Sequence, residues 1–200
     1  MTHAKTQLTV EEYLNLDAEG WSERGLPEGR CEYVADGALD ELPPESRPNL
    51  LIANYLLIKL IEVGVPFELV YTHACELEVM GKPKTRYPDL IVIRPEHLAL
   101  TLRRATITLK MPPPQLVAEV VSPGEQNQER DYEDKRQQYE ERGIPEFWLI
   151  DPEQSVVSVL TMEGSSYQAV EFRGSDRIHS EQFKQLNLTA EQILNAGMNQ

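Results

Sequence analysis

The amino-acid sequence predicts an α/β fold with a mixed central β-sheet flanked by helices. Residues 50–63 carry apolar side chains at three- and four-residue spacing, which is the pattern of a buried helix. Residues 89–93 and 116–121 are nearly continuous apolar runs, which are typical of strands covered on both faces. The chain has 200 residues and shows no internal repeat, so we expect a single domain over residues 1–200.

The N-terminal part is expected to hold a short helix followed by a hairpin. Thr9-Val-Glu-Glu12 is a capping box, whose hydroxyl and carboxylate satisfy free amides of a first helical turn, so a helix should begin there. Asp36-Gly37 is a hairpin turn signal between two strand-like runs. The sequence therefore predicts a loop at residues 20–29 and strands at residues 30–34 and 38–42.

The rest of the chain alternates between strand and helix patterns. Gly64 and Pro66 should end the helix of residues 50–63. Residues 75–80 alternate, which predicts that Glu76 and Glu78 lie on the face opposite the apolar side chains. Further strands are expected at residues 67–71, 89–93, 116–121, 147–150, 156–160 and 167–172, and further helices at residues 127–142 and 189–195.

The charge is distributed unevenly along the chain. It carries 33 acidic and 19 basic residues, a net charge of −14, and such an acidic protein repels nucleic acid at long range. Residues 82–110 differ, with seven basic and two acidic residues, which leaves −19 for the rest of the chain. The basic residues are Lys82, Lys84, Arg86, Arg94, Arg103, Arg104 and Lys110. We expect an anionic ligand to meet this segment, and the alternative is a solvated basic loop.

Cysteine usage and hydropathy indicate a cytoplasmic protein. Cys31 and Cys75 belong to no Cys-x-x-Cys pair, so we expect two reduced, buried thiols rather than a disulfide or a zinc site. The apolar runs are far shorter than the ~20 residues that span a bilayer, and residues 1–7 contain no signal-like apolar segment. We therefore expect no membrane association.

Three carboxylates occupy positions where a buried strand should be apolar. They are Glu32, Asp89 and Glu119. Desolvating a carboxylate costs several kcal/mol without a partner, and a divalent cation cancels two such charges at once. Mg²⁺ prefers oxygen ligands and is often held by one or two carboxylates. The alternatives are pairing with Arg, Lys or backbone amides, a simple strand start at Asp89 after Pro88, or a purely structural metal site.

Lys135 is a fourth candidate residue. Asp131, Lys135 and Tyr139 follow one another at four-residue spacing, so they share one face of the helix expected there. A lysine near a metal-bound water can position that water or stabilise charge on a phosphate. The alternative is an exposed Asp131–Lys135 pair, which is worth ~0.3 kcal/mol.

Several segments together resemble one protein family. They are Tyr87-Pro-Asp-Leu-Ile-Val-Ile93, Leu116-Val-Ala-Glu-Val-Val-Ser-Pro123, Asp131-x-x-x-Lys-Arg-x-x-Tyr139, Gly143-Ile-Pro-Glu-Phe-Trp-Leu-Ile-Asp-Pro152, Thr9-Val-Glu-Glu-Tyr-Leu14 and Arg30-Cys-Glu-Tyr-Val-Ala-Asp-Gly37. The chain is similar, over about residues 8–190, to the bacterial Uma-two family of restriction endonucleases within the PD-(D/E)XK nuclease superfamily. The resemblance implies a restriction-endonuclease-like core.

The resemblance also implies a metal site. Asp89 matches the metal ligand of the superfamily's Pro-Asp motif, Glu119 matches its second acidic ligand, and the main-chain carbonyl of Val120 would be the third ligand. Glu32 matches an N-terminal acidic residue that faces the same site.

Two positions depart from the usual pattern. The superfamily's lysine usually stands two residues after the second acid, where this chain has Val121, and the resemblance implies that Lys135 takes its place. The family often has a histidine at the start of its second helix, where this chain has Arg47-Pro-Asn49.

The function expected from the sequence is metal-dependent hydrolysis of phosphodiester bonds in nucleic acid, with Mg²⁺ or Mn²⁺ as the cofactor. A homodimer that brings two basic segments together would fit the acidic remainder of the chain. The alternative is a catalytically silent nucleic-acid-binding or regulatory module that retains the nuclease fold. The sequence does not distinguish DNA from RNA.

Overall fold

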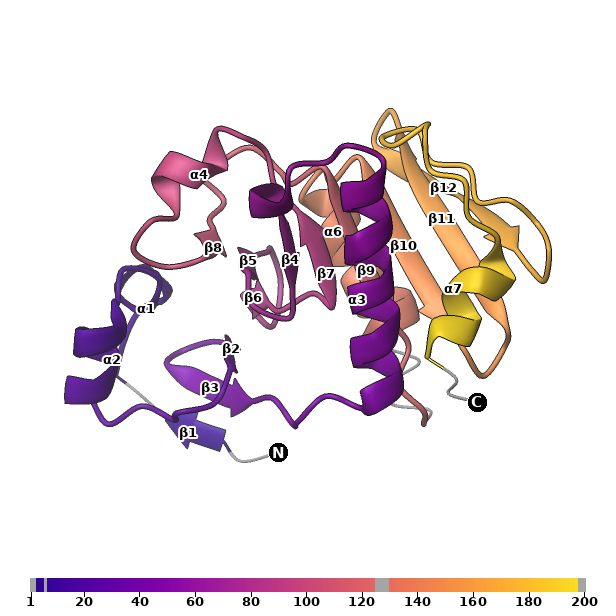
Figure 1. Ribbon diagram of the computed structural model, residues 1–200. Helices are drawn as coiled ribbons and strands as arrows, with labels where there is room; N and C mark the ends of the chain where they lie inside the picture. Colours follow the sequence, from indigo (N-terminus) through magenta and orange to yellow (C-terminus); the bar gives the residue numbers. More distant parts are fainter. Residues whose placement is uncertain (1–2, 6, 125–129, 198–200) are drawn as a thin grey trace.

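The computed structural model describes residues 3–5, 7–124 and 130–197. Its centre is a six-stranded mixed sheet with helices on both faces (Figure 1). The strands, in spatial order, are β12 (Ser166–Phe172), β11 (Val156–Glu163), β10 (Glu146–Asp151), β9 (Leu116–Val120), β7 (Leu90–Val92) and β4 (Val70–Thr72). Strands β9 and β10 run parallel, and the other neighbouring pairs are antiparallel. This arrangement confirms the predicted fold class.

Helices cover the sheet on both sides. Helix α3 (Arg47–Glu62) and helix α7 (Ala190–Ala196) pack on one face, where they share a hydrophobic core with the sheet (Figure 1). A π-helical turn, η2 (Arg130–Asp134), leads into helix α6 (Lys135–Glu141) on the other face. Because strand residues alternate between faces, Val120 points toward α3, whereas Glu119 and Val121 point toward α6.

A second layer lies beyond the α6 face of the sheet. Its small sheet consists of β6 (Thr85–Arg86), β5 (Glu76–Glu78) and β8 (Thr106–Ile107). The 3₁₀ turn η1 (Phe67–Leu69) precedes β4, and helix α4 (His97–Leu100) precedes β8. Leu77 and Ile107 contribute to the same hydrophobic core as Tyr139 of α6, so this layer closes one side of the central sheet.

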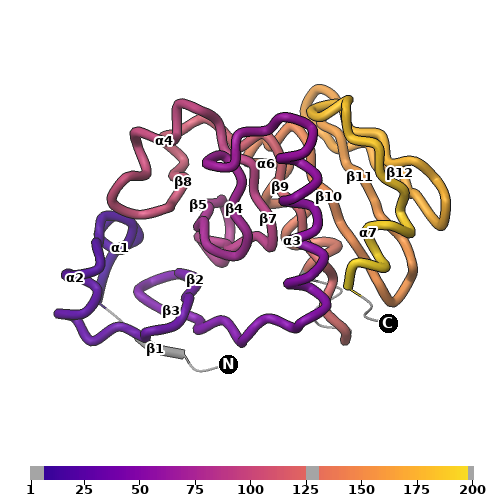
Figure 2. The backbone as a smooth tube through the Cα atoms, in the orientation of Figure 1, coloured from indigo at the N-terminus to yellow at the C-terminus, as the bar shows by residue number. Residues whose placement is uncertain are grey.

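The N-terminal residues form a separate small unit with its own core. It contains β1 (His3–Lys5), α1 (Val10–Leu14), α2 (Ala18–Glu23), β2 (Cys31–Tyr33) and β3 (Ala38–Glu41), and its strands form a three-stranded sheet. Figure 2 shows the segment from α4 to β8 lying beside α1 and α2. Two exposed ion pairs join these parts, Arg103–Asp17 and Lys110–Glu11.

Some elements differ from the sequence prediction. Residues 20–29 were predicted to be a loop, but Asp17 accepts a hydrogen bond from the Gly20 amide and caps helix α2. Helix α3 begins at Arg47 rather than residue 50, because Ser46 caps the Asn49 amide and Pro48 suits a first turn. The first residues of the helix predicted at 127–142 lie outside the described residues.

Two further predictions concern the cysteines and membrane-spanning helices. Cys31 and Cys75 are both free and buried, as expected for reduced thiols. Across the described ranges, no helix combines the length and the apolar character needed to cross a membrane.

Candidate active site

Two of the three predicted acidic residues, Asp89 and Glu119, lie on neighbouring chain segments at the centre of the large sheet, Asp89 directly before β7 and Glu119 within β9. The antiparallel register pairs Leu90 of β7 with Ala118 of β9, which places Asp89 opposite Glu119. Asp89 Oδ2 accepts a hydrogen bond of 2.6 Å from the Val120 amide. Asp89 Oδ2 is therefore held by the main chain at the end of β9, and the other oxygen, Oδ1, can contact other groups.

Glu119 is enclosed between the sheet and helix α6. Its Oε2 lies 2.7 Å from Lys135 Nζ, and its Oε1 accepts a hydrogen bond of 2.5 Å from the Tyr139 hydroxyl. Burial, together with the neighbouring carboxylates of Asp89 and Asp131, raises the pKa of Glu119 from 4.5 to about 7, although the Lys135 ammonium opposes this shift. Glu119 is thus a buried acid with a cationic partner.

Lys135 points toward the carboxylates, as the shared helix face predicts. Its Nζ lies 3.0 Å from Asp131 Oδ1, in addition to its contact with Glu119. Only 10% of the Lys135 side chain is exposed, so the alternative of a solvated surface pair is wrong. The first turn of α6 thereby places a positive charge beside the buried strand β9.

Glu32 reaches the same region from β2 but has an arginine partner. Glu32 Oε2 lies 3.2 Å from Arg86 Nη1, and Arg86 Nε donates to Gln138 Oε1 of α6. Arg86 Nη2 is buried and finds no hydrogen-bond partner in the described part of the chain. Glu32 therefore holds Arg86 in place, while Nη2 has no partner among the described residues.

These residues meet around one polar cavity of about 480 Å³. Its lining includes Glu32, Arg86, Asp89, Val120 and Lys135. The structure thus brings together all the site residues predicted from the sequence, with Glu119 directly behind Lys135. Their catalytic and metal-binding roles remain predictions.

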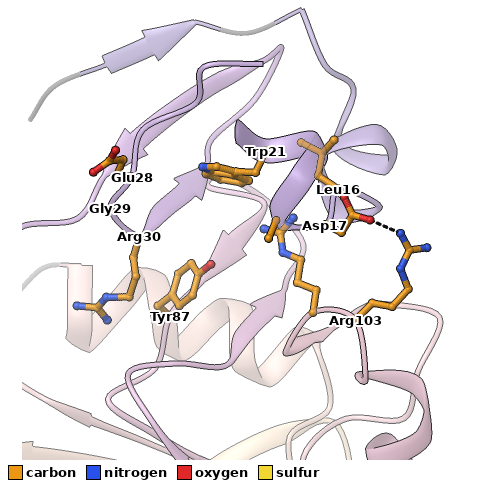
Figure 3. A pocket seen from close by; sticks show the side chains of 10 residues that line it. Leu16, Asp17, Trp21, Glu28, Gly29, Arg30, Tyr87 and Arg103 are labelled. Carbon is orange, nitrogen blue, oxygen red and sulfur yellow. Dashed lines mark hydrogen bonds and ion pairs between the residues drawn. The ribbon is translucent and has the colours of Figure 1, made fainter. Parts of the chain in front are cut away.

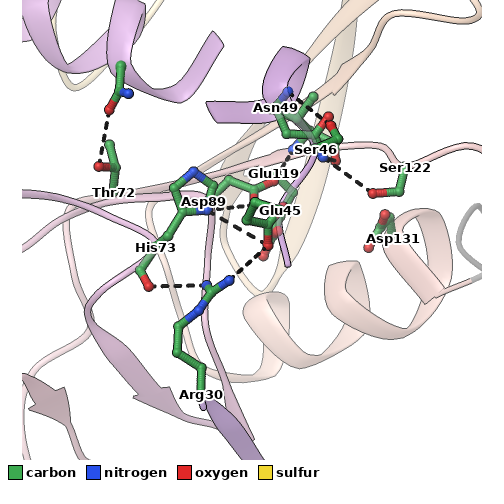
Figure 4. A network of polar contacts seen from close by, with 12 residues as sticks. Arg30, Glu45, Ser46, Asn49, Thr72, His73, Asp89, Glu119, Ser122 and Asp131 are labelled. Atoms are coloured by element: carbon green, nitrogen blue, oxygen red, sulfur yellow. Dashed lines mark hydrogen bonds and ion pairs between the residues drawn. The ribbon is translucent and has the colours of Figure 1, made fainter. Parts of the chain in front are cut away.

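Two residues that sequence reasoning missed, Glu45 and His73, lie beside Asp89 (Figure 4). One ligand atom from each of Glu45, His73 and Asp89 falls within 4.8 Å of the other two. His73 Nδ1 is 3.3 Å from Asp89 Oδ1 and 3.9 Å from Glu45 Oε1. Both His73 ring nitrogens are buried, and neither makes a hydrogen bond with any described residue. Arg30 fixes this group by contacting the Glu45 carboxylate and the His73 carbonyl.

Asn49 occupies the start of α3, where the family often has a histidine. Its Nδ2 lies 3.4 Å from the Val120 carbonyl oxygen and 3.3 Å from Ser122 Oγ. The Asn49 amide therefore contacts the carbonyl that the resemblance assigns as a ligand.

The basic segment of residues 82–110 does not form one continuous patch. Arg86 pairs with Glu32, and Arg104 pairs with the buried Glu76. Of the seven basic residues, Arg86 is the one that lines the central cavity. Two of the seven basic residues therefore have internal partners, and an anionic ligand at this segment stays a prediction.

Comparison with known proteins agrees with this fold. A crystal structure described as a "putative nuclease belonging to DUF820", from Anabaena variabilis ATCC 29413, superposes with a TM-score of 0.66. It is 16% identical in sequence, and the superposition covers 96% of this chain and 99% of that one, so the likeness shows the fold. No curated protein matches the sequence. Residues 10–191 match the family described as "Uma2: Putative restriction endonuclease". Since this match spans most of the chain, the protein belongs to the Uma2 family.

Proposed function

We propose that this protein is a divalent-metal-dependent nuclease that hydrolyses phosphodiester bonds of nucleic acid. One observation supports this proposal most strongly. Lys135 and Asp89 line one polar cavity, and the Lys135 ammonium contacts the buried carboxylate of Glu119 directly behind it. Membership of the Uma2 family supports the same reaction class.

The residues around Asp89 fit a divalent cation. Buried polar groups are normally hydrogen-bonded, so a buried imidazole with two unbonded nitrogens among the described residues indicates a missing partner. A cation near Asp89 Oδ1 would give one ring nitrogen of His73 a partner and would be shared with the Glu45 carboxylate. Imidazole suits transition metals better than it suits Mg²⁺, so this donor set favours Mn²⁺.

The other metal ligands that the resemblance implies, Glu119 and the Val120 carbonyl, are compatible with a cation beside Asp89. Each carboxylate oxygen of Glu119 accepts one hydrogen bond, and an ionised carboxylate oxygen has two lone pairs. The Val120 carbonyl likewise has a lone pair beyond its long contact with Asn49. Asp89 belongs to both ligand sets and is the residue on which cation binding depends. A bound cation supplies a water of lowered pKa and neutralises charge on the phosphate.

The chain's own residues supply the remaining charge. Lys135 is held by Glu119 and Asp131 at the cavity wall, where its ammonium is placed to donate to a phosphate oxygen as negative charge develops. Arg86 lines the same cavity, and its Nη2, which has no partner among the described residues, offers a second donor group. Glu32 and Tyr139 are positioning residues, because they hold Arg86 and Glu119 respectively.

A catalytically silent binding module is the second candidate function. One observation favours it, namely that both oxygens of Glu119 already have protein partners in Lys135 and Tyr139. Such a module would bind nucleic acid without cutting it. A cytoplasmic location and a homodimer also remain predictions, and the two free, buried cysteines support a reducing compartment.

The test is a cleavage assay with labelled single-stranded and duplex DNA and RNA. Each substrate is incubated with Mn²⁺, with Mg²⁺ and with a chelator. We expect products with Mn²⁺, slower cleavage with Mg²⁺ and none with the chelator. Binding without cleavage under every metal condition would contradict the nuclease function and support the silent module.

A further inference from the structure

A second cavity, of about 310 Å³, lies against helix α2 of the N-terminal unit (Figure 3). Its lining combines aromatic and basic side chains, including Trp21, Tyr87, Arg30, Arg103 and Arg104. In Figure 3, Trp21 reaches the cavity from helix α2, and Tyr87 lies across the space from it. No role for this cavity follows from the residues assigned above.

Tyr87 and Arg30 connect this cavity to the active site. Tyr87 lines both cavities and stands two residues before Asp89. The Arg30 guanidinium lies 5.9 Å from the centre of the Tyr87 ring, and it also contacts the Glu45 carboxylate and the His73 carbonyl. The two cavities are therefore neighbours that share the Tyr87 side chain in their linings.

The lining has the chemistry of a nucleotide site. Nucleic-acid bases stack on aromatic rings and on arginine planes, and arginines bind phosphate oxygens through charge-assisted hydrogen bonds. The volume lies at the lower end of the roughly 300–1,000 Å³ of small-molecule pockets, which suits one nucleotide. A base held inside a duplex could not reach such rings without being extruded from the stack.

Arg103 and Arg104 differ in how readily each can bind a ligand. Arg104 donates to the Glu76 carboxylate and to the Tyr13 carbonyl, and its guanidinium lies 4.5 Å from the Tyr13 ring centre and 5.3 Å from the Trp21 ring centre. These contacts fix it as part of the wall. Arg103 is 76% exposed and forms an ion pair with Asp17. A phosphate can compete with Asp17 for Arg103 far more readily than with Glu76 for Arg104.

We propose that this cavity binds one nucleotide of a single-stranded nucleic acid, next to the phosphodiester bond held in the active-site cavity. The base packs against Trp21 and Tyr87, and the phosphate contacts Arg103 in place of Asp17. The proposal rests on the nuclease function proposed above and adds a substrate class to it. The net charge of −14 supports this class, because a small basic site on an acidic protein cannot follow an extended duplex.

The first test compares two ion pairs of the same kind. Arg103–Asp17 borders the cavity, whereas Lys110–Glu11 is a more exposed pair that does not line it. Binding of a labelled single strand of about 10 nucleotides is measured by fluorescence anisotropy with Ca²⁺ present. Arg103→Ala should weaken binding about fivefold and reduce the salt slope by about 0.7, whereas Lys110→Ala should change neither.

Removing the competing carboxylate should have the opposite effect. Asp17→Asn keeps an oxygen that can accept from the Gly20 amide, so helix α2 stays capped. This variant should bind the single strand about threefold more tightly, because Arg103 no longer has an anionic partner. The matched variant Glu11→Gln should bind like the wild type. A gain in affinity cannot result from misfolding.

The aromatic side of the cavity has a separate test. Trp21→Ala should weaken binding by about 5- to 100-fold, as expected for the loss of one base stack, whereas Trp21→Phe should retain most of the affinity. The proposal is overturned if Arg103→Ala and Asp17→Asn both behave like their matched controls, or if a duplex binds more tightly than the single strand. If the wild type cleaves nucleic acid but the variants bind the single strand as their matched controls do, the nuclease function stands without this subsite. If the variants behave as expected but nothing is cut, the subsite stands and the nuclease function fails.

Discussion

Lys135 Nζ lies 2.7 Å from Glu119 Oε2, which joins the first turn of helix α6 to the buried strand β9. The ammonium thus reaches the acid from a neighbouring helix and not from two residues further along the strand, where Val121 is buried in the core. Because Asp131 also contacts Lys135, two carboxylates fix the position of the Lys135 ammonium at the cavity wall.

Lys135→Met should abolish most nuclease activity. The change removes the ammonium that faces a phosphate, and we expect the cleavage rate to fall at least ~100-fold. Stability should fall by about 3–5 kcal/mol, because Glu119 loses its buried cationic partner. The matched control is Lys184→Met, which breaks the exposed Lys184–Glu181 pair. Initial cleavage rates and urea unfolding curves check both effects, and equal rates in the two variants would remove Lys135 from the mechanism.

His73→Ala should alter the choice of metal. Imidazole contributes more to binding Mn²⁺ than to binding Mg²⁺, so Mn²⁺ affinity should fall at least ~10-fold while Mg²⁺ affinity changes less than ~3-fold. The control is His179→Ala, since His179 is an exposed histidine that also contacts a glutamate. Isothermal titration calorimetry measures each affinity. Unchanged Mn²⁺ binding by His73→Ala would exclude this side chain as a ligand.

His97 should make stability depend on pH away from the active site. Its Nδ1 accepts from the Arg94 amide and its Nε2 donates to the Pro112 carbonyl, so the folded state holds the neutral ring. Burial lowers the pKa of His97 below its usual 6.5. Since the lowered pKa belongs to the folded state, this contribution to stability is complete above pH 6.5 and is lost as the pH falls through that value.

The measurement is urea unfolding at about pH 7.5 and about pH 5.5. His97→Gln offers one acceptor and one donor without a titrating proton, so its stability should fall less over this interval than that of the wild type. Identical losses in the two proteins would show that His97 does not cause the dependence.

Local sequence patterns predicted the strands that hold Asp89 and Glu119, because a carboxylate within an apolar run is conspicuous. The same reasoning missed His73, whose position depends on a left-handed turn (φ 54°) after β4 and on a tertiary contact with Glu45. The alternation correctly placed Glu76 on the face opposite the apolar side chains, but it did not indicate what covers that face. The N-terminal unit covers that face, and Glu76 is buried against Tyr13.

The charge of residues 82–110 did not predict a basic surface. A net charge counted along the sequence predicts a basic surface only if the side chains stay in solvent. Arg86 and Arg104 instead turn inward to Glu32 and Glu76, which lie far from them in the sequence. The Arg86–Glu32 pair depends on how the N-terminal unit packs on the small sheet, and the Arg104–Glu76 pair depends on the pairing of β5 with β8, so no local pattern encodes either.

The central claim is that a divalent cation at Asp89 is required for cleavage of nucleic acid. Its most direct test is the initial rate of Mn²⁺-dependent cleavage of a labelled single strand by the wild type, Asp89→Asn and Asp134→Asn. Asparagine at position 89 keeps an acceptor for the Val120 amide, and Asp134 is an exposed acid on the rim of the same cavity. We predict a loss of at least ~100-fold for Asp89→Asn and less than ~3-fold for Asp134→Asn. Equal rates for the wild type and Asp89→Asn would contradict the account.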